Sequence, residues 1–303
     1  DIAKFNLYGM GGVSTIGYSY LDHFGGEWSD GEYTKSEKVT ADNITTFQVK
    51  GGGVFNLDDR LSAFANLGYV QKPPILDNVI SYDGTVASNP ANEKFTSYEV
   101  GGSYNSGLVA VKGSYYNTQW KDRNLTRNVE TGAGDSGDTD IIYLEGVDQS
   151  HSGVEVEAKV ALHEMVEVDF AFSKGDWFFD GDAQGDYLEQ EYNENGEIIG
   201  QMTTEYTYAL DKLKVGDMPQ TAYVGGLTLK PIKGLNIQGL LKIYDDNYAD
   251  WSPDSREVTG DEDRAQVWKA PGYNKLDLHL SYKLPQIAGY DLTLHGHVFN
   301  ALD

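Results

Sequence analysis

Hydrophobic and polar residues alternate strictly near the C-terminal end of the chain. Residues 276–284 read Leu-Asp-Leu-His-Leu-Ser-Tyr-Lys-Leu, so apolar side chains share one face and polar side chains the other. A period of two predicts a β-strand with one apolar and one polar face. A short break at 285–289 precedes a second alternating run at 292–298. The two runs are therefore predicted to pair as an antiparallel hairpin.

The same alternation recurs along the whole chain. No segment of useful length shows the period of a helix, so the fold class is predicted to be all-β, an antiparallel sheet of about eleven strands. The predicted strands lie at about 2–20, 44–56, 61–69, 95–105, 108–121, 154–160, 166–172, 221–229, 235–244, 276–284 and 292–298.

The connections between these strands alternate between short and long. Short turns are predicted near Asp58, Ser106, His163, Pro231 and Gln286. All long loops should therefore emerge at one end of the sheet, which is typical of a transmembrane β-barrel with short periplasmic turns and long external loops. A soluble sandwich or propeller usually has connections of mixed or uniformly short length. The long polar loops are predicted at 21–43, 71–94, 122–149, 176–217 and 245–272.

Composition narrows the classes of protein further. The 303 residues carry a formal net charge of −24, which argues against a nucleic-acid partner because phosphate binding needs a basic surface. The chain contains no cysteine, so disulfides and thiolate metal sites are excluded. No apolar run approaches the roughly 18 residues of a membrane-spanning helix. No signal segment precedes the strands, so Asp1 is expected to lie within a longer protein or to follow processing.

Charge and aromatic residues fit a wall between lipid and water. The apolar strand faces are almost free of charge, as a lipid-facing surface requires. Six aromatic residues lie near predicted strand ends, where the aromatic girdles of a membrane protein belong. Each of them also has a plainer interpretation as an ordinary strand aromatic. They are Tyr116, Trp120, Trp177, Tyr244, Tyr282 and Tyr290.

No catalytic constellation is present, and the chain is predicted not to be an enzyme. His163-Glu164 begins like a zinc-protease motif but lacks the second histidine, so these are predicted turn residues. His279, His295 and His297 share the polar side, which favours solvated histidines over a metal site in the lumen.

Acidic residues crowd two of the long loops. Oxygen-rich clusters of this kind suit Ca²⁺, although the spacing is not that of an EF-hand and a solvated acidic loop is the favoured interpretation. No other cofactor is implied. The candidate metal ligands are Asp176, Asp180, Asp182 and Asp186, with a second acidic group at Asp245, Asp246 and Asp250.

Aromatic residues in the same loops are candidates for binding a ligand. Aromatic faces beside carboxylates could grip a polar solute at the barrel mouth. Packing of one loop on another is an equally weighted alternative. The candidates are Trp177, Phe178, Phe179, Tyr187, Tyr248 and Trp251.

Several stretches, in order along the chain, resemble TonB-dependent outer-membrane receptors. Residues 298–303, Val-Phe-Asn-Ala-Leu-Asp, are similar to the Asn-Leu-Phe-Asp segment of the family's penultimate strand. Residues 215–221 are similar to a Pro-containing entry into a late strand. The other matching stretches are 67–74 with 89–101, 116–122 and 151–155.

The resemblance implies that residues 1–303 are the C-terminal part of a 22-stranded barrel, the family's eleventh to twenty-first strands. The plug domain, the N-terminal strands and the last strand are expected outside this chain. The implied function is active import of a scarce solute such as a metal chelate, vitamin, glycan or peptide across the outer membrane of a Gram-negative bacterium. The implied partners are membrane lipid, lipopolysaccharide, the TonB complex through the plug, and a surface lipoprotein.

Two alternatives remain open from the sequence. A passive porin or channel would share the barrel but lack a plug. A soluble surface β-protein that binds carbohydrate or calcium would carry polar residues on both faces of its sheet. The apolar stripes at 276–284 and 154–160 count against the soluble protein.

Overall fold

The computed structural model describes residues 4–23, 26–29, 32–81, 84–130, 139–192, 198–260, 262–286 and 289–302. Most of them form one 14-stranded sheet, and eleven strands make its continuous path in the order β1-β6-β7-β8-β9-β10-β11-β14-β15-β17-β18. Every pair of neighbours in this path is antiparallel. The predicted all-β fold with about eleven wall strands is confirmed.

The wall strands match the alternating segments of the sequence, and several run beyond them. They are β1 (Phe5–Ile16), β6 (Ile44–Asn56), β7 (Leu61–Lys72), β8 (Glu93–Asn105), β9 (Val109–Glu130), β10 (Thr139–His163), β11 (Val166–Phe179), β14 (Pro219–Leu229), β15 (Leu235–Tyr248), β17 (Tyr273–Lys283) and β18 (Thr293–Val298).

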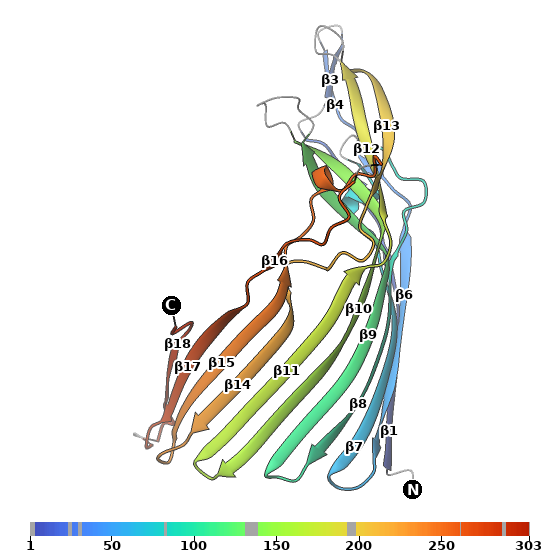
Figure 1. Ribbon diagram of the computed structural model, residues 1–303. Coiled ribbons are helices and arrows are strands. Elements are labelled where there is room, and N and C mark those ends of the chain that lie inside the picture. The colour runs from blue at the N-terminus through green and yellow to red at the C-terminus, as the bar shows by residue number, and fades with distance from the viewer. Residues whose placement is uncertain are drawn as a thin grey trace.

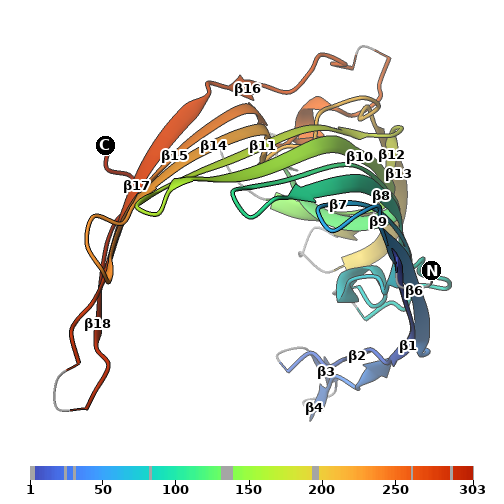
Figure 2. The ribbon, with the colours of Figure 1, turned by 90° about the horizontal axis from the view of Figure 1, so that it is seen from below.

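The sheet is a single curved layer. Viewed along its axis, it bends into an open arc that ends at β1 and β18 (Figure 2). The short turns lie at one end of the arc and the long connections at the other (Figure 1). In the turn after β6, the Asp58 carboxylate accepts hydrogen bonds from the N–H groups of Arg60 and Leu61 at 2.7 and 2.8 Å, and these bonds hold the pKa of Asp58 below its ordinary value.

Exposure along the strands is the reverse of that in a soluble protein. In β7, the apolar face with Leu61 and Leu67 is exposed, and the face with Ser62 and Asn66 is only partly exposed. Leu67 is 69% exposed and Leu278 of β17 is 42% exposed. An apolar band of this extent does not persist against water in a soluble monomer. An apolar outward face and a concave face that carries the polar side chains are typical of the wall of a membrane β-barrel.

Several predicted long loops contain strands, which corrects the sequence analysis. β9 and β10 extend through most of the segment predicted as the loop 122–149. β10 has 25 residues, more than twice the roughly 9–11 that a membrane-crossing strand needs. The remaining loop strands are β2 (Ser19–Tyr20), β3 (Gly26–Ser29), β4 (Glu32–Lys35), β5 (Val39–Thr40), β12 (Ala183–Tyr192), β13 (Ile198–Tyr208) and β16 (Lys269–Ala270).

The long connections at 122–149, 176–217 and 245–272 pack together into what we call the loop module. Its hairpin β12–β13 pairs with the outer end of β10 (Figure 1). Burial of apolar side chains stabilises this arrangement, because here they face water rather than lipid. The buried cluster at its centre comprises Ile142, Leu144, Val147, Phe179, Ala183, Tyr208, Leu210, Leu213, Trp251 and Val267.

Helical structure is minor. The described segments include two short 3₁₀ turns, η2 (Leu76–Asn78) and η3 (Pro253–Ser255). Neither they nor any other helix among the described residues has the length and apolar character to cross a membrane.

Candidate ligand site

Three of the six loop aromatics predicted to bind a ligand are packed inside the loop module. Phe179 and Trp251 are 2% and 5% exposed, and their rings meet edge to face with centroids 6.3 Å apart. Tyr248 packs against the same cluster. Tyr187 lies in β12, and its side chain falls outside the described residues. The burial of Phe179 and Trp251 corresponds to the alternative of loop-on-loop packing.

Trp177 and Phe178 are consecutive, so their side chains leave opposite faces of β11. The Lys212 ammonium lies 4.8 Å from the centroid of the Phe178 ring. The indole N–H of Trp177 donates to the Tyr116 hydroxyl at 2.9 Å, and its ring lies 5.7 Å from that of His151. The structure thus does not bring the predicted aromatics together in one site, and their role in ligand binding stays a prediction.

The predicted metal ligands Asp176 and Asp180 have lysine partners. Asp176 pairs with Lys214. Asp180 pairs with Lys212 at 3.0 Å and with Lys121 at 3.1 Å. Hydrogen bonds from Lys212 and then Lys121 hold the pKa of Asp180 below its ordinary value. Both carboxylates are therefore charge-compensated by the protein itself.

Asp182 is compensated in the same way. Its carboxylate accepts hydrogen bonds from Arg264 at 3.1 Å and from the N–H groups of Leu210 and Asp211 at 3.0 Å. Partial burial alone would raise the pKa of Asp182, but these bonds outweigh it and the pKa is lowered. The Asp186 side chain falls outside the described residues. Within the described part of the chain, no three or more His, Asp or Glu side chains are grouped to hold a metal ion, and Ca²⁺ binding stays a prediction.

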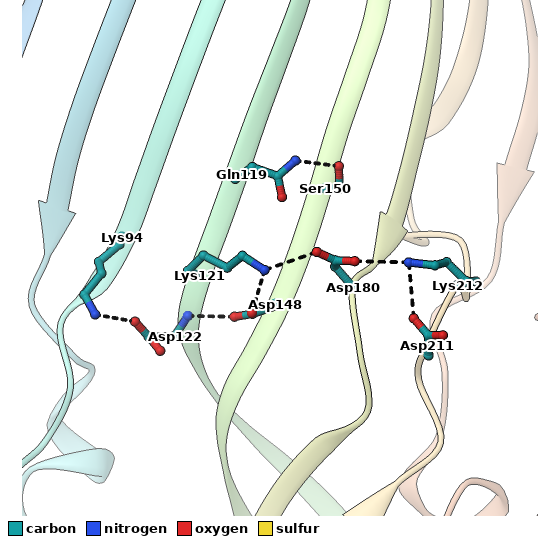
Figure 3. A network of polar contacts seen from close by, with 9 residues as sticks. All are labelled: Lys94, Gln119, Lys121, Asp122, Asp148, Ser150, Asp180, Asp211 and Lys212. Atoms are coloured by element: carbon teal, nitrogen blue, oxygen red, sulfur yellow. Dashed lines mark hydrogen bonds and ion pairs between the residues drawn. The ribbon is translucent and has the colours of Figure 1, made fainter.

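A row of ion pairs runs across the outer side of the wall (Figure 3). Lys94 of β8 pairs with Asp122 at 2.6 Å, and Lys121 of β9 pairs with Asp148 at 2.8 Å. Asp122 adopts a left-handed φ of 55°, which lets its carboxylate reach Lys94 while its N–H donates to Asp148 at 2.9 Å. Asp180 and Lys212 continue the row.

The register places this row on the apolar, outward face. Lys94 is two and four positions from Thr96 and Tyr98 in β8, so it leaves the same face as Tyr98. Tyr98 is exposed, and it belongs to the apolar belt with Val100. The ion pairs therefore mark the level at which the outward face changes from lipid-compatible to charged.

Polar side chains form a hydrogen-bonded ladder on the concave face. Tyr8 of β1 reaches across Gly52 of β6 to Asn66 of β7, and Asn66 lies opposite Glu99 of β8. The Tyr8 hydroxyl donates to the Asn66 side-chain oxygen, and the Asn66 amide donates to Glu99 at 2.9 Å. The ladder continues to Tyr116 of β9, which is opposite Glu99 in the register. Together these residues give the concave face a polar lining.

Glycines make room for the large rings of this ladder. Tyr116 lies across Gly153 of β10, where an added Cβ would come within 2.6 Å of the tyrosine hydroxyl. Trp177 lies across Gly175 of β11 in the same way, with its indole nitrogen 2.5 Å from an added Cβ. Any larger residue at either position would displace the ring, so the glycines hold Tyr116 and Trp177 flat against the wall.

Above the ladder lies a cluster that we call the mouth patch: Lys72, Glu93, Trp120 and Arg123. Glu93 is fully buried and accepts hydrogen bonds from Lys72 at 2.9 Å and from the indole N–H of Trp120 at 3.0 Å. The Arg123 guanidinium lies 4.3 Å from the Trp120 ring centroid. One carboxylate faces two cations, so the patch keeps a net positive charge beside an aromatic face. This combination suits a solute with planar and anionic groups.

The mouth patch and the ladder correct the predicted aromatic girdle. Tyr116, Trp120 and Trp177 lie on the polar, concave face and not at the lipid boundary. The sequence contained part of this information. Tyr116 and Trp120 are four positions apart and therefore share one face of the strand, whereas Tyr115 lies on the other face. The pairing of Tyr116 with Glu99 and of Trp120 with Phe95 across the strands could not be read without the register.

The structure also shows where the histidines noted in the sequence lie. His163 is the last residue of β10, and its Nδ1 accepts a hydrogen bond from the Met165 N–H in the turn to β11 at 3.2 Å. His279 and His297 are neighbours on the polar face of β17 and β18, and His295 lies next to His297.

Solved structures with the same fold include a copper transporter and receptors for iron compounds. The copper transporter OprC superposes with a TM-score of 0.63 at 16% identity, covering 100% of this chain and 41% of that chain. The ferric enterobactin receptor PfeA of Pseudomonas aeruginosa gives 0.59 at 14% identity, with 99% and 47% covered. The ferric-catecholate import receptor Fiu of E. coli K12 gives 0.56 at 13%, with 99% and 38% covered. The chain thus spans less than half the length of each, and at these identities the likeness shows the fold.

A search of curated proteins finds no match. The sequence model of the TonB-dependent receptor-like β-barrel matches residues 13–301, which is nearly the entire chain. The resemblance seen in the sequence is thereby confirmed, and the chain belongs to the family of TonB-dependent receptor β-barrels.

Proposed function

We propose that this chain is part of the wall and outer mouth of a TonB-dependent transporter that binds a scarce solute and imports it across the Gram-negative outer membrane. The observation that carries this proposal is the reversed exposure of the strands, with Leu67 and Leu278 facing outward and Asn66 and Glu99 facing the concave side. The remaining strands and the plug are proposed to close the barrel and to contact TonB.

The mouth patch is proposed to contact the solute, together with Trp177 from the original candidates. Trp120 and Trp177 lie on the concave side, and Arg123 and Lys72 place positive charge beside the Trp120 ring. The solute class remains a metal chelate, vitamin, glycan or peptide, and a net positive patch favours members with anionic groups. Lipid and lipopolysaccharide are proposed to contact the outward face, and a surface lipoprotein to cover the loop module.

The test is uptake by cells of the native host that carry the full-length gene or its deletion. We expect the deletion to abolish growth on one limiting solute, and loss of TonB to have the same effect because the proposed import is energy-driven. The W120A variant should bind that solute at least tenfold more weakly at unchanged abundance. The matched control Y98F alters the outward face and should transport normally. Uptake that continues without TonB would indicate a passive channel instead.

A further inference from the structure

Two histidines meet across the β17–β18 hairpin. His279 and His297 are directly opposite each other in the register. Their Nδ1 atoms are 2.8 Å apart, and the ring planes cross at 64° with centroids 5.0 Å apart. Each ring therefore directs a nitrogen at the other, and both side chains lie on the polar face of the wall.

Two imidazole nitrogens at this separation share one proton, since one ring must donate while the other accepts. The same nitrogens can instead bind one metal ion. With metal–nitrogen bonds of about 2.0–2.1 Å, two ligands of a tetrahedral ion lie roughly 3.3 Å apart. The pair would therefore need to separate by only about 0.5 Å to admit the ion.

Neighbouring rings fix the orientation of His297. His295 and Phe299, two residues before and after it, stack on either side with interplanar angles of 13° and 21° and centroids 6.2 and 6.0 Å away. The edge of Phe299 also meets His279 at 5.7 Å. Because the rings are held by these contacts, less side-chain freedom is lost when the ion binds.

The Asp277 carboxylate, two residues before His279 on the same strand face, is not free to join. One oxygen of Asp277 accepts a hydrogen bond from Lys242 at 2.7 Å, and the other accepts from the Asn300 N–H at 3.0 Å. Among the described residues, no carboxylate joins the two histidines as a third ligand. Two nitrogen ligands suit Zn²⁺, Ni²⁺ and Cu²⁺ and not Ca²⁺ or Mg²⁺.

We propose that His279 and His297 form a two-nitrogen site for a divalent late transition-metal ion, with water in the remaining positions. Coordination depends on this hairpin alone. Failure to bind metal would leave the proposed transport intact, and failure of transport would leave the metal site intact.

The test is titration of the metal-free, full-length protein in detergent with Cu²⁺, the divalent ion that binds such ligands most strongly. We expect calorimetry to show a site whose copper EPR spectrum carries coupling to two nitrogens. H279Q and H297Q should each weaken binding at least tenfold and remove one nitrogen coupling. H163Q, at the exposed end of β10, is the matched control and should bind like the wild type. Wild-type binding by H279Q and H297Q would overturn the proposal.

A second measurement tests the site in the wild-type protein, so that it does not depend on the folding of the variants. In the wild-type protein, Zn²⁺ should protect His279 and His297 from carbethoxylation, as read by mass spectrometry, while His163 stays reactive. Equal modification of all three with and without Zn²⁺ would also overturn the proposal.

Discussion

Leu67 on the outward face of β7 is 69% exposed, whereas Leu210 in the loop module is 0% exposed. Both are leucines of one chain, yet each is suited to a different solvent. The wall is one layer thick and is proposed to meet hydrocarbon, where its apolar side chains need no covering layer. The loop module stands in water, so its apolar side chains must be buried against each other. The boundary between the two regimes is the row of ion pairs from Lys94 to Lys212.

The largest effect is expected from opening the buried cluster of the loop module. Phe179→Ala should destabilise the module by about 3–5 kcal/mol, because it removes a buried ring and leaves a cavity. Limited proteolysis of the full-length protein should show faster cleavage within 176–217. The matched variant Leu229→Ala, on the outward face of β14, should change stability by less than about 1 kcal/mol. Similar losses in both would contradict the two-solvent account.

A charge introduced on the outward face of the wall tests the same comparison in the membrane region. Leu278→Arg should cost about 2–4 kcal/mol in a bilayer, because the outward face of β17 meets lipid there. Ser281→Arg lies on the polar face of the same strand and should cost much less. Urea unfolding in vesicles measures both. The order of the two costs would be reversed if the polar face met the lipid.

Much of this comparison was predictable from sequence, and the reason is local. Alternation at 276–284 gave the strand, its faces and its hairpin partner, since a period of two is a property of neighbouring residues. The hairpin β12–β13 and the upper halves of β9 and β10 were missed. Their polar sequences resemble loops, and they are held by Leu144, Phe179 and Leu210, which meet only in the tertiary structure.

The candidate site was predicted less well for a related reason. Trp177 was found as a ring near the barrel mouth, but Lys72, Glu93 and Arg123 come from three strands. Lys72 and Glu93 fall in stretches that resemble the receptor family, yet nothing in those stretches marks them as ligand-binding residues. The register that brings them together depends on pairing across strands distant in sequence. Trp251 is of a residue type that often binds ligands. Only its burial in the structure shows that it packs inside the loop module.

The smallest predicted effect concerns the charged boundary itself. The pKa of Asp180 in the folded protein lies below its ordinary value of 3.8. Its pairs with Lys212 and Lys121 therefore stabilise the fold above about pH 4, and this contribution is lost as the pH falls through the lowered pKa. Hydrogen exchange near 205–215 should rise on acidification in the wild type, and Asp180→Asn should reduce that dependence. The control Asp211→Asn removes a neighbouring carboxylate of Lys212 and should preserve the pH dependence of hydrogen exchange. An unchanged pH dependence in Asp180→Asn would exclude Asp180 as the titrating group.

The central claim is that alternate residues of a wall strand face lipid and an aqueous interior. Because the chain contains no cysteine, single cysteines at 278, 279, 280 and 281 of the full-length protein in bilayers can each carry one spin label. Accessibility to lipid-soluble oxygen should alternate, high at 278 and 280 and low at 279 and 281. Uniform accessibility, or the opposite phase, would contradict the account.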